Sequence, residues 1–293
     1  MCFGDVLTAM VTPFHEDGSV NYEKAQELAL HLLDHGSDGI LICGTTGESS
    51  TVTPAEAETL LREVKDAVGK KGTVIAGAGS NNTAGVVELI KKYNKLDLDG
   101  YLSVVPYYNK PSKAGLYKHF EAINAAVERP VMIYNIPGRT GIKMDTDTLV
   151  RLAELKNIKA LKESTGSVDD LSQLLLKLPK DFAVYSGDDY MTFAAVAMGA
   201  TGVISVASHL VGNEIKEMIQ CIKNDNMDRA RELHLQLYPM FKGLFVTANP
   251  IPVKTALNLL GFEVGGFRLP MCEATVEETA FIKDLLNQYA LLS

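Results

Sequence analysis

The feature that most constrains the fold of this chain is a set of short, continuous apolar runs that recur between Val6 and Val206. Strands with one exposed face alternate apolar and polar residues, whereas strands buried on both faces of a parallel sheet form unbroken apolar runs. We therefore expect eight buried strands. They are Val6–Val11, Gly39–Cys43, Thr73–Gly77, Gly100–Val104, Val131–Tyr134, Ile158–Lys162, Ala183–Ser186 and Val203–Val206.

Amphipathic segments with helical spacing separate these runs. Their clearest members are Tyr22–Leu33, Pro54–Val68, Thr83–Tyr93, Gly115–Val127, Asp145–Leu155 and Val168–Leu178. The start of the second is marked by Thr53 as N-cap and by Pro54 at the first helical position. Eight strands that alternate with helices predict a (β/α)8 TIM barrel, an α/β fold.

A mostly helical tail follows the eighth run, from about Glu214 onward. We therefore expect two regions, a catalytic barrel over 1–224 and a C-terminal helical extension over 225–293. The rival fold is an open, doubly wound sheet. Such a sheet usually carries a G-x-G-x-x-G turn after its first strand, and this chain has Thr12-Pro13-Phe14 there.

Composition narrows the class of protein. Hydrophobic residues make up 46% of the 293 residues, which is enough for a substantial core. The net charge of -8 disfavours nucleic acid or an anionic membrane as a partner. The four cysteines (Cys2, Cys43, Cys221 and Cys272) form no C-x-x-C pair, so we expect free thiols. The first five residues lack the features of a secretory signal, and we expect a cytoplasmic protein.

One uncharged stretch is long enough to cross a bilayer, from Tyr190 to Asn213. Gly199, Gly202 and several polar residues interrupt it. We interpret it as a helix, a glycine turn and a buried strand rather than as a membrane span.

In a barrel of this kind the active site lies at the carboxyl ends of the strands. That rule selects the residues at or after the ends of six predicted strands. They are Gly44–Ser49, Pro106–Asn109, Tyr134–Gly141, Lys162–Ser164, Ser186–Asp189 and Ile204.

Lys162 is the candidate nucleophile, because it ends an apolar run. Burial lowers the pKa of a lysine, and the neutral amine then forms Schiff bases with carbonyl substrates. The alternative for Lys162 is a strand-end lysine that reaches water or pairs with Glu163.

Four further residues share that end of the predicted barrel. Tyr134 ends the neighbouring strand and can move protons. Thr45 and Thr46 offer hydroxyl and backbone donors suited to a carboxylate or a proton relay, and Arg139 offers a fork suited to a carboxylate. Taken singly, the threonines are also compatible with a tight turn, Tyr134 with a strand-end phenol in contact with water, and Arg139 with a solvated loop charge. The prediction of a site therefore depends on their joint location.

Metal and phosphate sites are disfavoured. The six histidines are scattered, and His31 and His35 lack the glutamate of an H-E-x-x-H motif. A phosphate site is expected after strands seven and eight, where Asp188 and Asp189 would repel it. We therefore expect no metal and no cofactor.

At motif level the whole chain resembles the dihydrodipicolinate synthase family of pyruvate-dependent class I aldolases, the superfamily that includes N-acetylneuraminate lyase. The motifs that carry the resemblance are Thr8–Phe14, Gly44–Ser49, Pro106–Pro111, Tyr134–Gly141, Asn249–Lys254 and Arg268–Met271. The paired threonines and Arg139 favour the synthases over the sialic-acid lyases, which typically carry Ser-Thr and lack that arginine.

The resemblance implies a reaction and a set of roles. Lys162 would form a Schiff base with pyruvate, and the derived enamine would attack L-aspartate-4-semialdehyde. Ring closure would release Lys162 and give 4-hydroxy-tetrahydrodipicolinate, the first committed step of the diaminopimelate route to lysine, with water leaving later. The implied proton relay is Tyr134, Thr45 and Tyr108 from a neighbouring subunit. Thr46, Gly187 and Ile204 would form the pyruvate pocket, and Arg139 would hold the semialdehyde carboxylate.

A shared Tyr108 implies at least a dimer, and the family is commonly a tetramer built as a dimer of dimers. Members inhibited by lysine usually carry polar or basic residues where this chain has Pro54 and Ala57, and an acidic residue where it has Gly85. We therefore expect weak lysine inhibition or none. Two other functions stay open: a silent barrel that senses a keto acid, and an aldolase acting on a sugar-derived 2-keto acid.

Overall fold

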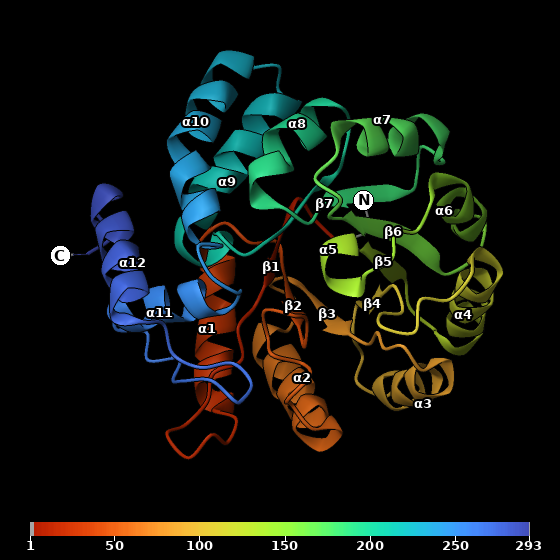
Figure 1. The fold of residues 1–293 in the computed structure, drawn as a ribbon, viewed down its shortest axis with the longest axis horizontal. Coiled ribbons are helices and arrows are strands. Elements are labelled where there is room, and N and C mark those ends of the chain that lie inside the picture. Colours follow the sequence, from red (N-terminus) through yellow and green to blue (C-terminus); the bar gives the residue numbers. More distant parts are fainter. Residues whose placement is uncertain (1–2, 293) are drawn as a thin grey trace.

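The computed structural model describes residues 3–292. Its eight parallel strands close into a barrel in chain order, as the alternation of runs and helices predicts (Figure 1). The strands are β1 (Val6–Ala9), β2 (Gly39–Ile42), β3 (Thr73–Gly77), β4 (Gly100–Val104), β5 (Val131–Asn135), β6 (Ile158–Glu163), β7 (Ala183–Ser186) and β8 (Gly202–Ser205).

Helices surround the barrel. They are α1 (Tyr22–Asp34), α2 (Pro54–Val68), α3 (Thr83–Tyr93), α4 (Lys113–Ala126), α5 (Pro137–Thr140), α6 (Thr146–Ala153), α7 (Val168–Lys177), the 3-10 helix η1 (Asp189–Met191), α8 (Thr192–Ala197) and α9 (Ser208–Lys223). Thr53 caps α2 with a complete capping box, and Pro54 occupies the first turn, as the sequence predicts.

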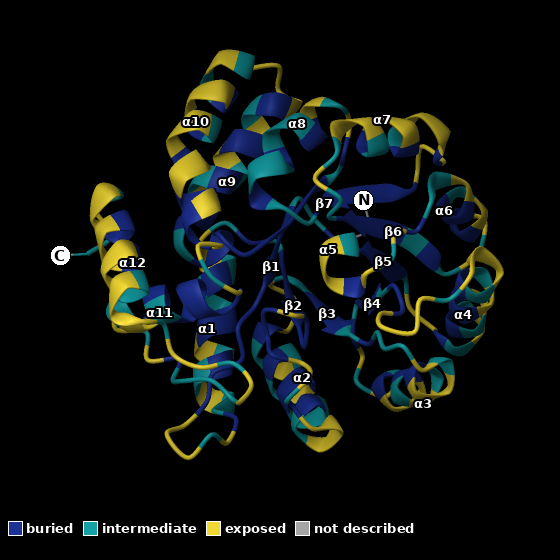
Figure 2. Ribbon diagram, viewed as in Figure 1, coloured by how far each residue is buried: buried dark blue, intermediate teal, exposed yellow. Residues whose placement is uncertain are grey.

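The strands are buried on both faces, as Figure 2 shows by their dark colour. Alternate residues face the barrel interior and the helices, because side chains of a strand point to opposite faces in turn. Ala160 and Ile204 belong to the apolar cluster inside the barrel. Their neighbours Leu161 and Val203 belong to the larger cluster under the helices. This alternation decides which side chains reach the barrel interior.

Three more helices follow the barrel and form the C-terminal extension. They are α10 (Met227–Gly243), α11 (Ile251–Leu259) and α12 (Val276–Gln288). Helix α10 packs on α9, and α11 packs on α9 and α12. Figure 1 shows α11 and α12 on the same side of the molecule as α1.

The structure differs from the sequence prediction at several element ends. Strand β1 stops at Ala9 rather than Val11, because the Val11 N–H donates to His209 Nε2 at 3.2 Å instead of to a strand. The last barrel helix begins at Ser208, before Glu214, and is kinked at Val211. The short helix α5 was not predicted.

The uncharged stretch from Tyr190 onward forms α8, a glycine turn and β8. Within residues 3–292, no helix is long and apolar enough to cross a membrane. Cys43, Cys221 and Cys272 are free thiols, and Cys2 lies outside the described residues.

Candidate active site

Lys162 and Tyr134 meet inside the barrel. They are paired in register on β6 and β5. Lys162 lies two residues after Ala160 and Tyr134 two residues after Met132, so both share the face of the interior cluster. The Lys162 Nζ atom lies 4.4 Å from the centroid of the Tyr134 ring. The sequence prediction that these two side chains share one space is confirmed in this geometry.

The Lys162 amine is held in a state suited to nucleophilic attack. Its side chain is 5% exposed, and burial lowers its pKa from 10.5 to about 8. Asp188 and Asp189 act in the opposite direction and raise this pKa, while Arg139 lowers it. Burial therefore outweighs the two carboxylates, and a sizeable fraction of the amine is neutral near pH 8.

The alternative pairing of Lys162 with Glu163 is wrong. Glu163 follows Lys162 on the strand and so points to the opposite face. Its carboxylate accepts hydrogen bonds from Asn135 Nδ2 at 3.0 Å and from the Thr165 N–H at 2.9 Å. The neighbouring acid is thus satisfied on the outer side of the barrel and does not hold the lysine.

Gly187 touches the lysine directly. A β-carbon at position 187 would lie 1.9 Å from Ser164 Oγ and 2.9 Å from Lys162 Cε. Both distances are far below a van der Waals contact, so only glycine fits. The Gly187 N–H donates to the Glu163 carbonyl at 2.8 Å, which fixes this turn across β6.

The sequence placed Asp188 and Asp189 at the active end of the barrel, as groups that repel phosphate, and their effect on the lysine was missed. Burial raises the pKa of Asp188 to about 6, although Lys162 lowers it. Asp189 is buried, and its carboxylate accepts from Ser205 Oγ and from the N–H groups of Val206 and Ala207. Asp189 therefore ties β7 to the loop after β8, and its buried charge lies near the amine.

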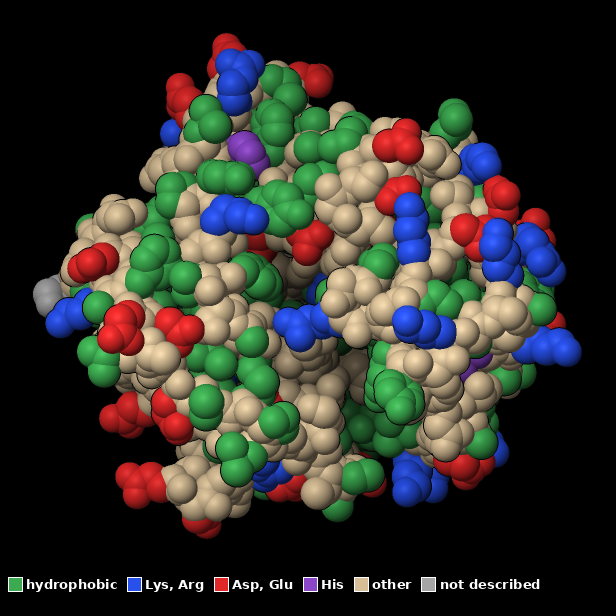
Figure 3. Space-filling model, in the orientation of Figure 1, with side chains coloured by type: hydrophobic (Ala, Val, Ile, Leu, Met, Phe, Trp, Pro, Cys, Tyr) green, Lys and Arg blue, Asp and Glu red, His purple; other side chains and the backbone are tan. Residues whose placement is uncertain are grey.

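A cavity of about 610 Å³ opens at this end of the barrel. Thr45, Tyr134 and Arg139 line it together, whereas Lys162 does not line it and contacts the Tyr134 ring. Arg139 lies on α5, which starts at Pro137 and is capped by Gly141 in the left-handed conformation. Burial raises the pKa of Tyr134, so its phenol stays protonated at neutral pH. The face seen in Figure 3 is hollowed near its centre, with basic and acidic side chains on opposite edges.

The loop after β2 presents its two threonines differently. Thr45 is exposed to the cavity, whereas Thr46 is 3% exposed and accepts a hydrogen bond from Asn249 Nδ2 at 2.9 Å. The Glu48 carboxylate in the same loop forms a buried ion pair with Lys254 at 2.9 Å. The sequence gives Asn249 and Lys254 no individual role, because nothing local in a sequence joins their motif to this loop.

Two further predicted site residues do not line this cavity. Ile204 is buried in the interior cluster on β8, in register with Leu7. Tyr108 is not brought to the cavity of its own chain: its side chain is 88% exposed and its φ is 70°. The preceding Tyr107 does line the cavity.

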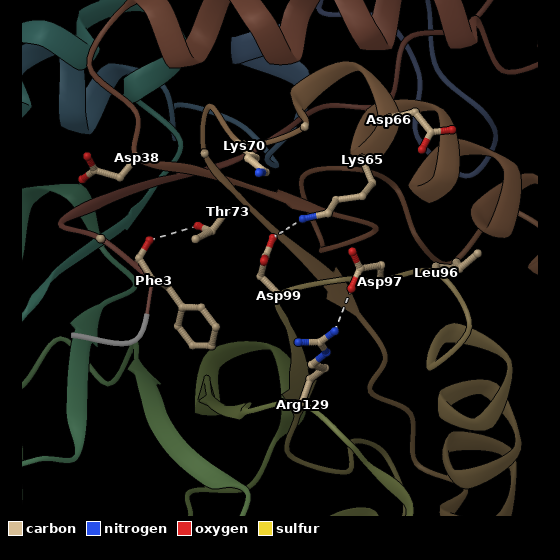
Figure 4. Close-up of a pocket in the computed structure, with 13 residues that line it drawn as sticks. Phe3, Asp38, Lys65, Asp66, Lys70, Thr73, Leu96, Asp97, Asp99 and Arg129 are labelled. Carbon is tan, nitrogen blue, oxygen red and sulfur yellow. Dashed lines mark hydrogen bonds and ion pairs between the residues drawn. The ribbon is translucent and has the colours of Figure 1, made fainter.

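A larger hollow of about 970 Å³ lies at the amino ends of the strands (Figure 4). Four of its charged side chains form two ion pairs within it. Lys65 lies 2.7 Å from Asp99, and Arg129 lies 2.7 Å from Asp97. The Thr73 hydroxyl donates to the Phe3 carbonyl at 3.0 Å. Because none of the described residues that line it is a buried nucleophile, we assign chemistry to the smaller cavity at the opposite end.

Among residues 3–292, no group of three or more His, Cys, Asp or Glu side chains could hold a metal ion. The rings of His31 and His35 stack with centroids 4.0 Å apart, and His35 Nδ1 lies 2.7 Å from the His31 carbonyl.

Comparison with known proteins identifies the relatives of this chain. The model of the dihydrodipicolinate synthetase family matches residues 2–289. The 4-hydroxy-tetrahydrodipicolinate synthase of Nostoc punctiforme is 51% identical, over 99% of each chain. A structure of the Cyanidioschyzon merolae enzyme with lysine bound is 47% identical and has a TM-score of 0.97 over 99% of each chain. A monomeric dihydrodipicolinate synthase variant is 38% identical with a TM-score of 0.97, over 99% of this chain and 98% of the variant.

Proposed function

Because the chain belongs to the dihydrodipicolinate synthetase family, we propose that the site around Lys162 and Tyr134 performs the family's reaction through a Schiff base. The reaction is that of a 4-hydroxy-tetrahydrodipicolinate synthase, a lyase. It condenses pyruvate with L-aspartate-4-semialdehyde to 4-hydroxy-tetrahydrodipicolinate, in the diaminopimelate route to lysine. The single observation that best supports the site is the buried lysine, with a pKa lowered to about 8, beside the Tyr134 ring.

In the proposed mechanism the neutral Lys162 amine attacks the keto carbon of pyruvate. Loss of water gives the imine, and loss of a methyl proton gives the enamine. The enamine carbon bonds to the aldehyde carbon of the semialdehyde. The substrate's own amino group then displaces Lys162 and closes the ring. The covalent imine serves as the electron sink, so we propose that no separate cofactor takes part.

Proton transfer in these steps is assigned to a relay of Tyr134, Thr45 and Tyr108. Burial keeps the Tyr134 phenol protonated, so it can donate a proton to the departing oxygen and recover it later. Thr45 lines the same cavity. Thr46, Gly187 and Ile204 form the pyruvate pocket in this proposal, and Arg139 at the cavity wall binds the semialdehyde carboxylate.

Tyr108 reaches the relay only from a second subunit in this proposal. Two observations support this: its side chain is exposed and so available to a partner, and its left-handed backbone is a conformation that a non-glycine residue keeps when its surroundings impose it. We propose a homo-oligomer, a tetramer built as a dimer of dimers. Mixing Lys162→Ala with Tyr108→Phe tests this, because hybrid dimers contain one intact shared site. Recovery of activity supports the shared relay, and an active monomer in ultracentrifugation removes it.

Two further assignments accompany the function. We propose a cytoplasmic location, supported by the free thiols Cys43, Cys221 and Cys272. We also propose a division of the chain into a catalytic barrel over 1–224 and a helical extension over 225–293. The last barrel helix ends at Lys223 and the next helix begins at Met227, which supports that boundary.

The deciding experiment measures pyruvate consumption with a panel of aldehydes for the wild type and Lys162→Ala. We expect strong preference for aspartate semialdehyde, and loss of kcat by a factor on the order of 10³ or more in the variant. Borohydride should trap pyruvate on the wild type only. Preference for another aldehyde would favour an aldolase acting on a sugar-derived 2-keto acid. Arg139 would then not be the residue that binds the semialdehyde carboxylate. Trapping of pyruvate without condensation would favour a silent keto-acid sensor.

A further inference from the structure

Residues of the C-terminal extension form hydrogen bonds with the Gly44–Ser49 loop. Lys254 Nζ on α11 donates to Glu48 Oε1 at 2.9 Å and to the Thr12 carbonyl at 3.1 Å. The Arg268 N–H donates to the other carboxylate oxygen of Glu48 at 3.2 Å. Glu48 has a φ of 52°, a left-handed conformation that a non-glycine residue keeps only when its surroundings impose it. The loop conformation therefore depends on a distant part of the chain.

Asn249 adds a contact of a different kind, because it bonds to a side chain of the proposed pyruvate pocket. Its Nδ2 donates to Thr46 Oγ1 at 2.9 Å, across 203 positions of sequence, and both side chains are buried. A hydroxyl has one proton, and its oxygen accepts. The amide occupies the oxygen as acceptor. The Thr46 hydroxyl makes no second hydrogen bond within residues 3–292, so its proton is free to donate to a ligand.

The second observation concerns the carbonyl oxygen of the Asn249 side-chain amide. Asn249 Oδ1 is buried and has no hydrogen-bond partner among the described residues. A buried, unpaired carbonyl oxygen destabilises a fold, and an apolar residue would avoid that cost. Among the described residues, the Asn249 side chain makes one hydrogen bond, from Nδ2 to Thr46 Oγ1. The arrangement thus favours a role that needs this donor rather than mere packing.

We propose that Asn249 is a positioning residue for the keto acid: by donating to Thr46 Oγ1, it turns the Thr46 hydroxyl proton toward the substrate carboxylate. A carboxylate accepts hydrogen bonds only, so a hydroxyl that must donate is the correct partner. This inference rests on the proposed function, in which Thr46 belongs to the pyruvate pocket. It gives the helical extension a function, namely to fix the position of the loop after β2 and the direction of the Thr46 hydroxyl proton.

The test uses Asn249→Ala and Asn249→Asp in the full-length enzyme. Asn249→Ala removes the donor. Asn249→Asp keeps the shape but replaces the donor by a carboxylate, which would accept the Thr46 proton and repel the substrate anion. Asn258→Ala is the matched control, because Asn258 lies on α11 and its side chain donates to the Gly265 carbonyl at 2.9 Å, away from Thr46. Borohydride trapping at increasing pyruvate concentration gives half-saturation without the second substrate.

We expect the pyruvate concentration at half-saturation to rise about tenfold in Asn249→Ala, and further in Asn249→Asp. The KM for aspartate semialdehyde should change little in both variants. The thermal midpoint should change little in Asn249→Ala and fall in Asn249→Asp, because the latter buries a carboxylate without a counter-ion. Asn258→Ala should match the wild type. Combining Asn249→Ala with Thr46→Ala should add nothing to the effect of Thr46→Ala alone.

Unchanged half-saturation in both Asn249 variants overturns the inference, as do fully additive effects in the double variant. Asn249→Ala guards against misfolding, because alanine introduces no buried charge and removes the unpaired carbonyl oxygen. If the wild type itself traps no pyruvate, the proposed function fails and the inference fails with it. If the wild type traps pyruvate and the variants match it, only the role of Asn249 is lost.

Discussion

The Lys162 ammonium nitrogen lies 4.4 Å from the centroid of the Tyr134 ring, at matching positions on neighbouring parallel strands. A ring face over a cation favours the charged form, yet burial still lowers the Lys162 pKa to about 8. Burial moves the Tyr134 pKa upward at the same time. The pair therefore combines an amine that loses its proton readily with a phenol that keeps one, which is the distribution that imine formation requires.

Gly187→Ala should disable the site without disturbing the barrel. The added β-carbon would lie 1.9 Å from Ser164 Oγ and 2.9 Å from Lys162 Cε, so the lysine side chain must move. Displacement of a reacting group by about 1 Å typically costs a hundredfold in rate, and we expect roughly that loss in kcat/KM.

Ser164→Ala provides the internal check on that variant. It removes the closest atom, so the double variant should recover part of the lost kcat/KM. Gly85→Ala is the control, because a β-carbon there meets only Asn82, at 3.5 Å or more. Wild-type kinetics for Gly187→Ala would show that the lysine has room to move.

The sequence predicts the barrel well because each strand signal is local. Unbroken apolar runs locate all eight strands, and strand order then places Lys162 and Tyr134 side by side. Contacts between distant segments are not predictable in this way. Asn249 and Thr46 are 203 positions apart and Lys254 and Glu48 are 206 apart, and no periodicity relates them.

Other parts of the site escape prediction for a different reason. The effect of Asp188 on Lys162 depends on how deeply the carboxylate is buried, and residue type alone does not reveal burial. Helix α5 has only four residues, so its helical period is too short to recognise in sequence. Its Pro137 start and Gly141 end are local signals that could have found it.

Asp188→Asn should change both the pH profile and the stability of the enzyme. Asp188 raises the Lys162 pKa, so its neutralisation should lower that pKa below about 8 and shift the acid limb of pyruvate trapping to lower pH. The Asp188 pKa is raised from 3.8 to about 6 in the folded state. A raised carboxyl pKa costs stability above pH 6, and this cost disappears as the pH falls toward 3.8.

The thermal midpoint of Asp188→Asn should therefore exceed that of the wild type at pH 8, and the difference should narrow between pH 6 and pH 4. Asp181→Asn makes the same charge change at an exposed position before β7 and serves as control. An acid limb that stays in place in Asp188→Asn would show that this carboxylate does not act on Lys162.

Free lysine should inhibit weakly or not at all. Lysine carries two ammonium groups, and no carboxylate lines the 610 Å³ cavity among the described residues. Pro54 and Ala57 form part of its wall instead. Calorimetric titration with lysine, alongside the lysine-bound Cyanidioschyzon merolae enzyme as binding control, measures the difference. Inhibition by sub-millimolar lysine in a kinetic assay would contradict this prediction.

Lys254→Met should be strongly destabilising. Lys254 and Glu48 are 0% and 2% exposed, and removing the cation leaves a carboxylate buried without its counter-ion. Such a change typically costs about 3–5 kcal/mol of unfolding free energy, measurable as a lower urea midpoint. Asp97→Asn breaks the exposed pair with Arg129 and should cost less than about 1 kcal/mol. Because Glu48 shares its loop with Thr46, pyruvate binding should weaken as well. Adding Glu48→Gln to Lys254→Met should restore part of the stability, since it removes the carboxylate that has lost its counter-ion. A urea midpoint for Lys254→Met no lower than that for Asp97→Asn would show that the buried ion pair does not stabilise the fold.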